Sequence, residues 1–168
     1  MTRRSMTQRA ALVTAAALVA VGTVAAGVSL AGSDAPAKTQ PGKKQVATLF
    51  DRWNTALQTG DPDKVADLYA KDAVLLPTVS DKVRTDRAEI VDYFEHFLLN
   101  KPVGKKIQTI VKVLDGNSAI DTGVYEFTLT DPDTGKKRVV KARYSYEYEK
   151  VGGTWKIQNH HSSAMPES

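Results

Sequence analysis

The sequence contains no cysteine. This absence excludes disulfides, a thiolate nucleophile, zinc sites built on cysteine and a lipid anchor of the lipoprotein type. It says little about the compartment, because a domain of this length can be stable without covalent cross-links.

The excess of positive charge in this chain is also small. The net charge is +4, and the first 37 residues contribute +2 of it through Arg3, Arg4, Arg9 and Asp34. In the rest of the chain Lys and Arg alternate with Asp and Glu, so the sequence does not indicate nucleic-acid binding. A glycine pattern for dinucleotides and a histidine spacing for zinc are both missing, so we expect no cofactor and no metal.

The amino-terminal segment has the layout of a secretory signal peptide. A basic start is followed by an uncharged run from Ala10 to Ser33 and by patterns of small residues. The run is long enough to span a bilayer, so an uncleaved anchor is the alternative, although its Ala, Gly and Thr content makes insertion only marginally favourable. We therefore predict a signal peptide or N-terminal membrane anchor at 1–37, a linker at 38–44 and one domain at 45–166. The domain is expected to be secreted or extracytoplasmic, with membrane contact only if the anchor is retained.

The first half of the domain shows apolar residues at helical spacing. The first helix is expected to end at Gly60, and Asp61 and Pro62 suit the start of a second. A short apolar strand ended by Pro77 separates the second helix from a third, which begins at the capping residue Asp86. The apolar stripes of the three helices are predicted at 46–57, 65–69 and 90–98.

Beyond residue 102 the hydrophobic period changes from 3.6 to 2, which indicates strands. The turns between them have the chemistry of hairpins. Helices followed by hairpin-linked strands predict the α+β class, with three N-terminal helices packed on one face of a curved antiparallel sheet. The long strands are expected at 106–114, 118–130, 136–150 and 154–163.

Alternation along the last strand predicts which of its side chains point inward. Trp155 and Ile157 form the only apolar start of a face, so we expect that face to be buried. Unbroken alternation then places Asn159, His161 and Ser163 in the interior. The other two histidines, His96 and His160, are expected to face solvent or an interface.

Three tyrosines, Tyr144, Tyr146 and Tyr148, share one face of the preceding strand. Such a stripe is unusual for a solvated sheet surface. We expect it to be exposed and to form a homo-oligomeric interface, in a dimer or a larger assembly.

Five stretches of the sequence carry a resemblance to a known family. They are RWNTALQTGDPDKVADLYAKDAVLLP, EIVDYFEHFL, AIDTGVYEFT, ARYSYEYEK and WKIQNHHSSAMPE. The first is similar to the opening of the nuclear transport factor 2-like superfamily. The others resemble bacterial, stand-alone, SnoaL-like relatives of the calcium/calmodulin-dependent kinase II association domain. No stretch resembles a kinase nucleotide loop, so kinase activity is not implied.

The resemblance implies a cone whose sheet wraps around a pocket and which assembles through its sheet into dimers or rings. In association domains this pocket carries arginines and a histidine that accept small carboxylates. Arg143 is similar in position to one such arginine, His161 to a strand histidine and Ser163 to a closing serine. Asn159 stands where relatives often have a histidine, and Tyr125 about where they have a second arginine.

The chemistry of these residues leaves alternatives open. Arg143 is either a structural ion-pair partner of Asp121 or Glu147, or an anchor for a carboxylate or carbonyl group. His161 is either a satisfied core residue or a donor or general base. An interior Asp121 is kept ionised beside an arginine, or has a raised pKa in an apolar cone. The predicted ligand-binding set is Trp53, Tyr69, Asp121, Tyr125, Arg143, Asn159, His161 and Ser163.

Three functions fit this reading. The first is an exported, self-associating domain that binds a small carboxylate- or carbonyl-bearing molecule. The second is an enzyme on the same scaffold, an isomerase, cyclase or hydratase that uses His161 and Asp121 for acid–base chemistry. The third is an oligomerisation module whose cavity is filled by side chains. The fold cannot decide among them, because one scaffold hosts many activities.

Overall fold

The computed structural model describes residues 40–166 and confirms the α+β class. The predicted signal peptide or anchor lies outside the described residues, so it and the exported location stay predictions. Within residues 40–166, no helix is long and apolar enough to cross a membrane. The elements are α1 Lys43–Ala47, α2 Leu49–Gln58, α3 Pro62–Ala66, β1 Tyr69–Leu76, α4 Arg87–Phe97, the 3₁₀ turn η1 Leu98–Asn100, β2 Val103–Val113, β3 Ser118–Thr130, β4 Lys137–Val151 and β5 Thr154–Ala164.

The first predicted helix is two helices, α1 and α2, which meet at Thr48. The Thr48 hydroxyl donates to the carbonyl of Gln45 (2.7 Å), a local bond that competes with a continuous helix. The first of these helices begins at Lys43, inside the predicted linker. The caps of the later helices are as expected, because the side chains of Asp61 and Asp86 accept backbone N–H bonds at the starts of α3 and α4.

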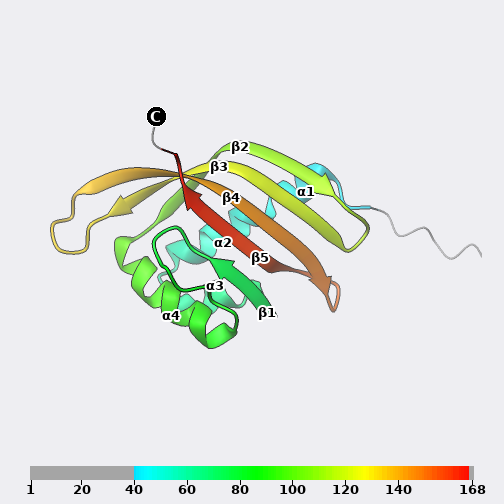
Figure 1. Cartoon of the computed structure of the whole chain (residues 1–168), viewed down its shortest axis with the longest axis horizontal. Helices are drawn as coiled ribbons and strands as arrows, with labels where there is room; N and C mark the ends of the chain where they lie inside the picture. Colours follow the sequence, from blue (N-terminus) through cyan, green and yellow to red (C-terminus); the bar gives the residue numbers. More distant parts are fainter. Residues whose placement is uncertain (1–39, 167–168) are drawn as a thin grey trace, which may run out of the picture. The chain divides into compact units, whose positions relative to one another are not determined.

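Five strands form one sheet in the order β1-β5-β4-β3-β2. Strands β2 to β5 pair antiparallel, whereas β1 pairs parallel with β5. Helices α2, α3 and α4 lie on one side of the curved sheet (Figure 1). The last strand, β5, therefore lies inside the sheet between β1 and β4, and side chains on its helix-facing side belong to the core. Tyr69, predicted at the end of a helix, is instead the first residue of β1.

A β-bulge interrupts the alternation of β5. Tyr148 pairs with Ile157 and the preceding Glu147 pairs with Asn159, so Gln158 is an extra residue between them. An extra residue shifts all later side chains to the opposite face. This bulge determines what the last strand contributes to the interior.

The bulge overturns the predicted orientation of the two adjacent histidines. His160 is only 4% exposed and faces the helices together with Ser162, whereas His161 is exposed. Asn159 and Ser163 follow His161 to the outer face of the sheet, since they pair with the outward residues Glu147 and Arg143. The prediction was wrong because it continued the alternation of Trp155 and Ile157 through the bulge.

The tyrosine stripe is buried rather than exposed. Tyr144, Tyr146 and Tyr148 are each at most 2% exposed, and the Tyr146 ring lies 5.7 Å from the Trp53 ring of α2. Large aromatic side chains bury more apolar area than the alternating face that carries Arg143, so the helices cover the tyrosines. The predicted homo-oligomeric interface through this stripe is therefore wrong.

Strand β2 also contains a bulge, at Ile107. Here the backbone of β2 approaches β3 so closely that a Cβ on Gly123 would lie 1.9 Å from the Gln108 carbonyl oxygen. Only glycine fits this contact. The bulge leaves Lys106 on the helix-facing side of the sheet, where it meets Asp121.

Candidate functional site

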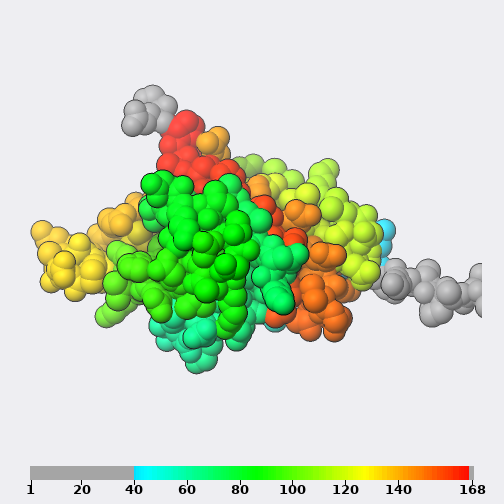
Figure 2. Space-filling model, turned by 60° about the horizontal axis from the view of Figure 1, so that its bottom comes forward, coloured from blue at the N-terminus to red at the C-terminus, as the bar shows by residue number. Residues whose placement is uncertain are grey.

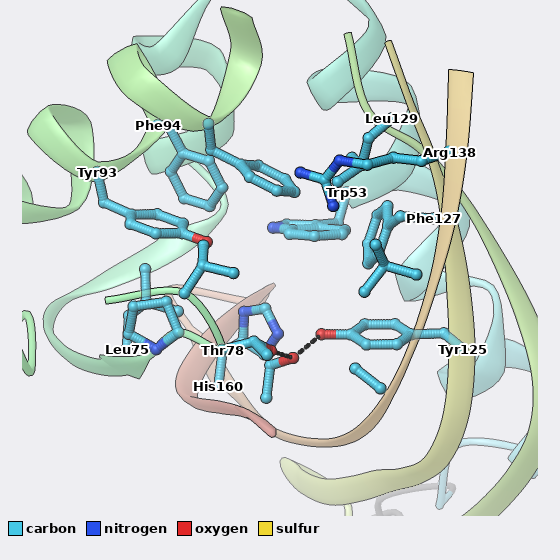
Figure 3. A pocket seen from close by; sticks show the side chains of 16 residues that line it. Trp53, Leu75, Thr78, Tyr93, Phe94, Tyr125, Phe127, Leu129, Arg138 and His160 are labelled. Carbon is cyan, nitrogen blue, oxygen red and sulfur yellow. Dashed lines mark hydrogen bonds between the residues drawn. The ribbon is translucent and has the colours of Figure 1, made fainter. Parts of the chain in front are cut away.

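A small cavity of about 60 Å³ lies between the helices and the sheet, with room for a few water molecules. Its walls are largely aromatic and come from α2, α4 and β3, and His160 of β5 closes its inner end (Figure 3). Helix α4 and the segment between β1 and α4 form the molecular surface over this region (Figure 2). The aromatic wall residues are Trp53, Tyr93, Phe94, Phe97, Tyr125 and Phe127.

His160 is held by a chain of buried hydrogen bonds. The Trp53 indole N–H donates to the Tyr69 hydroxyl oxygen (3.1 Å), and this hydroxyl lies 2.9 Å from His160 Nδ1. The phenolic hydrogen of Tyr69 needs an acceptor, and among residues 40–166 the one in reach is Nδ1. Nδ1 is therefore unprotonated, and the proton of the neutral imidazole resides on Nε2.

The opposite edge of the His160 ring has no partner. Nε2 is buried without a hydrogen bond to any of the described residues. Nδ1 is directed at Tyr69, which does not line the cavity, whereas His160 itself does. A buried N–H without a partner costs on the order of 1–3 kcal/mol, and an acceptor atom that forms a hydrogen bond with it would remove this cost.

The imidazole of His160 is neutral. Burial lowers the pKa of His160 to about 3, and the neighbouring His161 acts in the same direction. The ring stacks on Tyr146 with 4.1 Å between centroids, which leaves no room for a counter-ion on that face. At neutral pH the group therefore supplies a hydrogen bond without a charge.

A second polar group borders the same cavity. The Tyr125 hydroxyl donates to Ser162 Oγ, and Ser162 Oγ also contacts Thr78 Oγ1 of the segment that follows β1 (Figure 3). Burial raises the pKa of Tyr125 above its usual value, so its phenol stays protonated. These three hydroxyls form hydrogen bonds with one another and so connect β3, β5 and the segment after β1 at the edge of the cavity.

Arg138 lines the outer end of the cavity. It lies near the start of β4, on the opposite side of Trp53 from His160 (Figure 3). Its side chain is exposed, and no ion pair within residues 40–166 holds its guanidinium. The cavity is thus neutral at its inner end and cationic at its mouth.

The predicted ligand-binding residues fall into three places. Trp53 and Tyr125 line the cavity and Tyr69 holds its histidine. Arg143, His161 and Ser163 are brought together, but in a groove of about 480 Å³ on the outer face of the sheet. Asn159 also faces outward, as its pairing with Glu147 shows. Whether any of these residues binds a ligand stays a prediction.

Asp121 belongs to a separate buried cluster beneath α1. Its carboxylate accepts from Lys106 Nζ (2.9 Å) and from the Tyr144 hydroxyl (3.0 Å), and Lys106 also donates to the Ala47 carbonyl (2.7 Å). Its ionic partner is therefore Lys106, not the predicted Arg143. Desolvation raises the pKa of Asp121, and the hydrogen bond from Lys106 opposes that rise.

The predicted acid–base pair is not assembled. Asp121 is fully buried on the helix-facing side of the sheet, whereas His161 is exposed on the other side. The two groups cannot reach one substrate. Residues 40–166 also contain no group of His, Asp and Glu that could hold a metal ion.

Comparison with known proteins places this chain in a family. The model of the calcium/calmodulin dependent protein kinase II association domain matches residues 42–166. The chain belongs to this family. A protein of Xanthomonas campestris, proposed to be such an association domain, is similar in structure with a TM-score of 0.74 and 58% identity, over 77% of this chain and 94% of that one.

More distant structures share the fold of this association domain. A nuclear transport factor 2-like protein of Salmonella enterica is 18% identical with a TM-score of 0.65, over 75% of this chain and 92% of that one. A proposed dehydratase of the same superfamily from Streptomyces avermitilis is 16% identical with a TM-score of 0.65, over 74% and 97% of the two chains. No curated protein matches the sequence. At these identities the two distant structures establish the nuclear transport factor 2-like fold alone.

Proposed function

We propose that the cavity between helices and sheet binds a small organic molecule that bears a carbonyl or carboxylate group. The observation that carries the proposal is the buried and unpaired Nε2–H of His160, a residue that lines this largely apolar cavity. Pockets for small molecules combine such apolar walls with a few fixed polar groups. An acceptor oxygen on the ligand removes the cost of the unpaired donor.

The small volume of the cavity restricts the ligand. A space of about 60 Å³ accepts a compact group, and anything larger needs the exposed side chains at the mouth to move. Arg138 and Val79 are such side chains, and Val79 is 71% exposed. We therefore expect a group smaller than an aromatic ring to enter the cavity as it stands, and an aromatic ring to enter only when these side chains move.

The test is binding of simple aromatic probes, acetophenone and benzoate, followed by NMR of the Trp53 and His160 side chains. We expect at least one probe to shift both sets of signals. His160→Phe keeps a ring against Tyr146 but removes the donor, and should weaken binding about tenfold, the effect of losing about 1.4 kcal/mol.

The matched control is His161→Phe, which alters the adjacent, exposed histidine. This change is expected to leave probe binding unchanged. The proposal fails if neither probe perturbs the cavity signals, or if both histidine variants bind the probes as the unchanged protein does.

We propose in addition that the domain self-associates through the outer face of its sheet. The family is that of association domains, and this face exposes apolar side chains at Val103, Ile110 and Val139, which are 48%, 48% and 62% exposed. Isolated apolar residues are common on surfaces, but these three lie on one uncovered sheet face. A second copy of the same face is the partner that we infer.

Sedimentation velocity at micromolar concentration tests this interface. The protein is expected to sediment as a dimer or larger species, and the double substitution Ile110→Lys with Val139→Lys should shift it to the monomer. Leu99→Lys is the control, because Leu99 is 60% exposed but lies in η1, away from the sheet face. A monomeric protein, or an assembly that survives the double substitution, contradicts the proposal.

A further inference from the structure

The outward-facing side chains of β4 carry their charges in a self-complementary order. Strand β4 is the middle strand of the sheet (Figure 1), and it pairs with β3 without a break in register, so its odd-numbered residues share the outer face. These residues are Val139, Lys141, Arg143, Ser145, Glu147, Glu149 and Val151. Two basic residues precede Ser145, two acidic residues follow it at the same spacing, and a valine lies at each end. The order of the charges is therefore inverted about Ser145.

Such an order fits a second copy of the same strand. We propose that two copies of the domain join through the outer face of the sheet, with their β4 strands antiparallel and with a two-fold axis that crosses the strands at Ser145. Arg143 of each copy then lies opposite the partner's Glu147, and this contact forms twice because the interface is symmetric. This inference rests on the proposed self-association and specifies its geometry.

Neither of these two charges has an ionic partner in its own chain. Arg143 and Glu147 are both exposed, and no ion pair within residues 40–166 includes either of them. They lie four residues apart on one strand, about 13 Å, and strand side chains stand roughly perpendicular to the sheet, so the two do not meet. Their neighbours across the sheet carry no charge and are Val124 and Ser163 beside Arg143, and Ile120 and Asn159 beside Glu147. A second copy supplies the missing opposite charges at the required spacing.

The neighbouring strands add matching contacts. An axis that runs across the strands lays β3 on the partner's β3 and β5 on the partner's β5. Val124 then lies opposite the partner's Ile120, so apolar side chains meet. Ser163 lies opposite the partner's Asn159, which pairs a hydroxyl with an amide. Stacked sheets pack about 10 Å apart and cross at about 30°, so the pairs closest to the axis contribute most.

The row of residues on the axis contains no acidic or strongly basic side chain. A residue on a two-fold axis faces its own copy, so a lysine or a glutamate there would repel itself. From β2 to β5 the row consists of Ile110, Thr122, Ser145 and His161. Ile110 is 48% exposed, so its contact with the partner's Ile110 buries apolar area.

The order of the charges also opposes the other symmetric arrangement of this face. A two-fold axis along β4 would set Arg143 against the partner's Arg143, and Glu147 against the partner's Glu147. Like charges that face each other across an interface disfavour the complex. The antiparallel arrangement replaces both repulsions with attraction.

The experiment reverses the two charges singly and together. Sedimentation velocity over a concentration series gives the dissociation constant of the dimer at low ionic strength, where exposed charges are least screened. Arg143→Glu and Glu147→Arg should each raise this constant about thirtyfold, because each change turns two attractive pairs into two repulsive ones. The double variant Arg143→Glu with Glu147→Arg restores opposite charges across the axis. Its dissociation constant should return to within about threefold of that of the unchanged protein.

Glu95→Arg is the matched control. Glu95 is an exposed residue of α4, on the other side of the sheet (Figure 1), and no ion pair within residues 40–166 includes it. Its reversal changes the net charge as Glu147→Arg does, and should leave the dissociation constant unchanged.

Three outcomes contradict the antiparallel arrangement although the dimer stands. The single variants dimerise as the unchanged protein does, the double variant dimerises no better than the single ones, or Glu95→Arg weakens the dimer as much as Glu147→Arg. A monomeric unchanged protein has a different meaning, because then the proposed self-association itself fails.

Discussion

Replacing Lys106 by methionine is expected to lower the free energy of unfolding by about 3 kcal/mol at pH 7, because a buried ion pair then loses one partner. Asp121 is fully buried and Lys106 is 14% exposed, so the carboxylate would keep only the Tyr144 hydroxyl. The bond from Lys106 to the carbonyl of Ala47 would also be lost, and with it a link between α1 and the sheet. Urea unfolding followed by circular dichroism, at one protein concentration, measures the effect.

The matched control is Lys105→Met. Lys105 is the neighbouring lysine on the other face of β2; its side chain is 75% exposed and it makes only a long contact of 3.9 Å with Glu126. We expect this change to cost less than about 0.5 kcal/mol. Desolvation already raises the pKa of Asp121, and removal of Lys106 raises it further. The defect of the Lys106 variant should therefore shrink as the pH falls and Asp121 is protonated. Equal stability of the two variants would contradict this role.

Acidification is expected to destabilise the protein through His160. The folded pKa of His160 is about 3, below the 6.5 of an unfolded histidine, so the unfolded chain binds a proton more readily. The stability that the buried, neutral His160 contributes to the folded protein is complete above pH 6.5 and is lost as the pH falls from 6.5 toward 3. Over this range the free energy of unfolding falls by about 1.4 kcal/mol per pH unit, which gives a loss of about 2 kcal/mol between pH 7 and pH 5.

Comparison of variants isolates the histidine from other titrating groups, including Asp121, whose raised pKa acts in the opposite direction. His160→Phe should be less sensitive than the unchanged protein to a fall in pH from 7 to 5, whatever its absolute stability. His161→Phe should retain the full dependence, because it leaves the buried His160 in place. The same pH slope in all three proteins would show that His160 is not buried in its neutral form.

Most of the fold could be predicted from the sequence. The change of hydrophobic period near residue 102, and the hairpin turns, located β2 to β5 to within a few residues. The capping residues Asp61 and Asp86 located the starts of α3 and α4. These features are local, so they can be recognised in the sequence without knowledge of the tertiary structure. One exception was Thr48, where a single side-chain hydrogen bond divided one expected helix into two, and another was Tyr69, which begins β1 instead of ending a helix.

The candidate site could not be predicted, because it depends on which face the helices cover and on one bulge. Alternation correctly grouped Tyr144, Tyr146 and Tyr148, but it did not say whether their face was inside. The extra residue Gln158 has no feature in sequence that distinguishes it from a regular strand position. It moved the interior imidazole from 161 to 160. Arg138 lies in a region of the sequence rich in charged residues, and no feature of the sequence indicated that it would line the cavity.

The central claim is that a bulged strand places the His160 imidazole inside the cone as a neutral donor with its proton on Nε2. Long-range ¹H–¹⁵N NMR of the histidine side chains tests it directly. We expect one histidine, identified by its loss in His160→Phe, to be protonated at Nε2 and not at Nδ1, and to remain neutral from pH 7 to pH 5. A His160 that titrates near 6.5, or that carries its proton on Nδ1, would contradict the account.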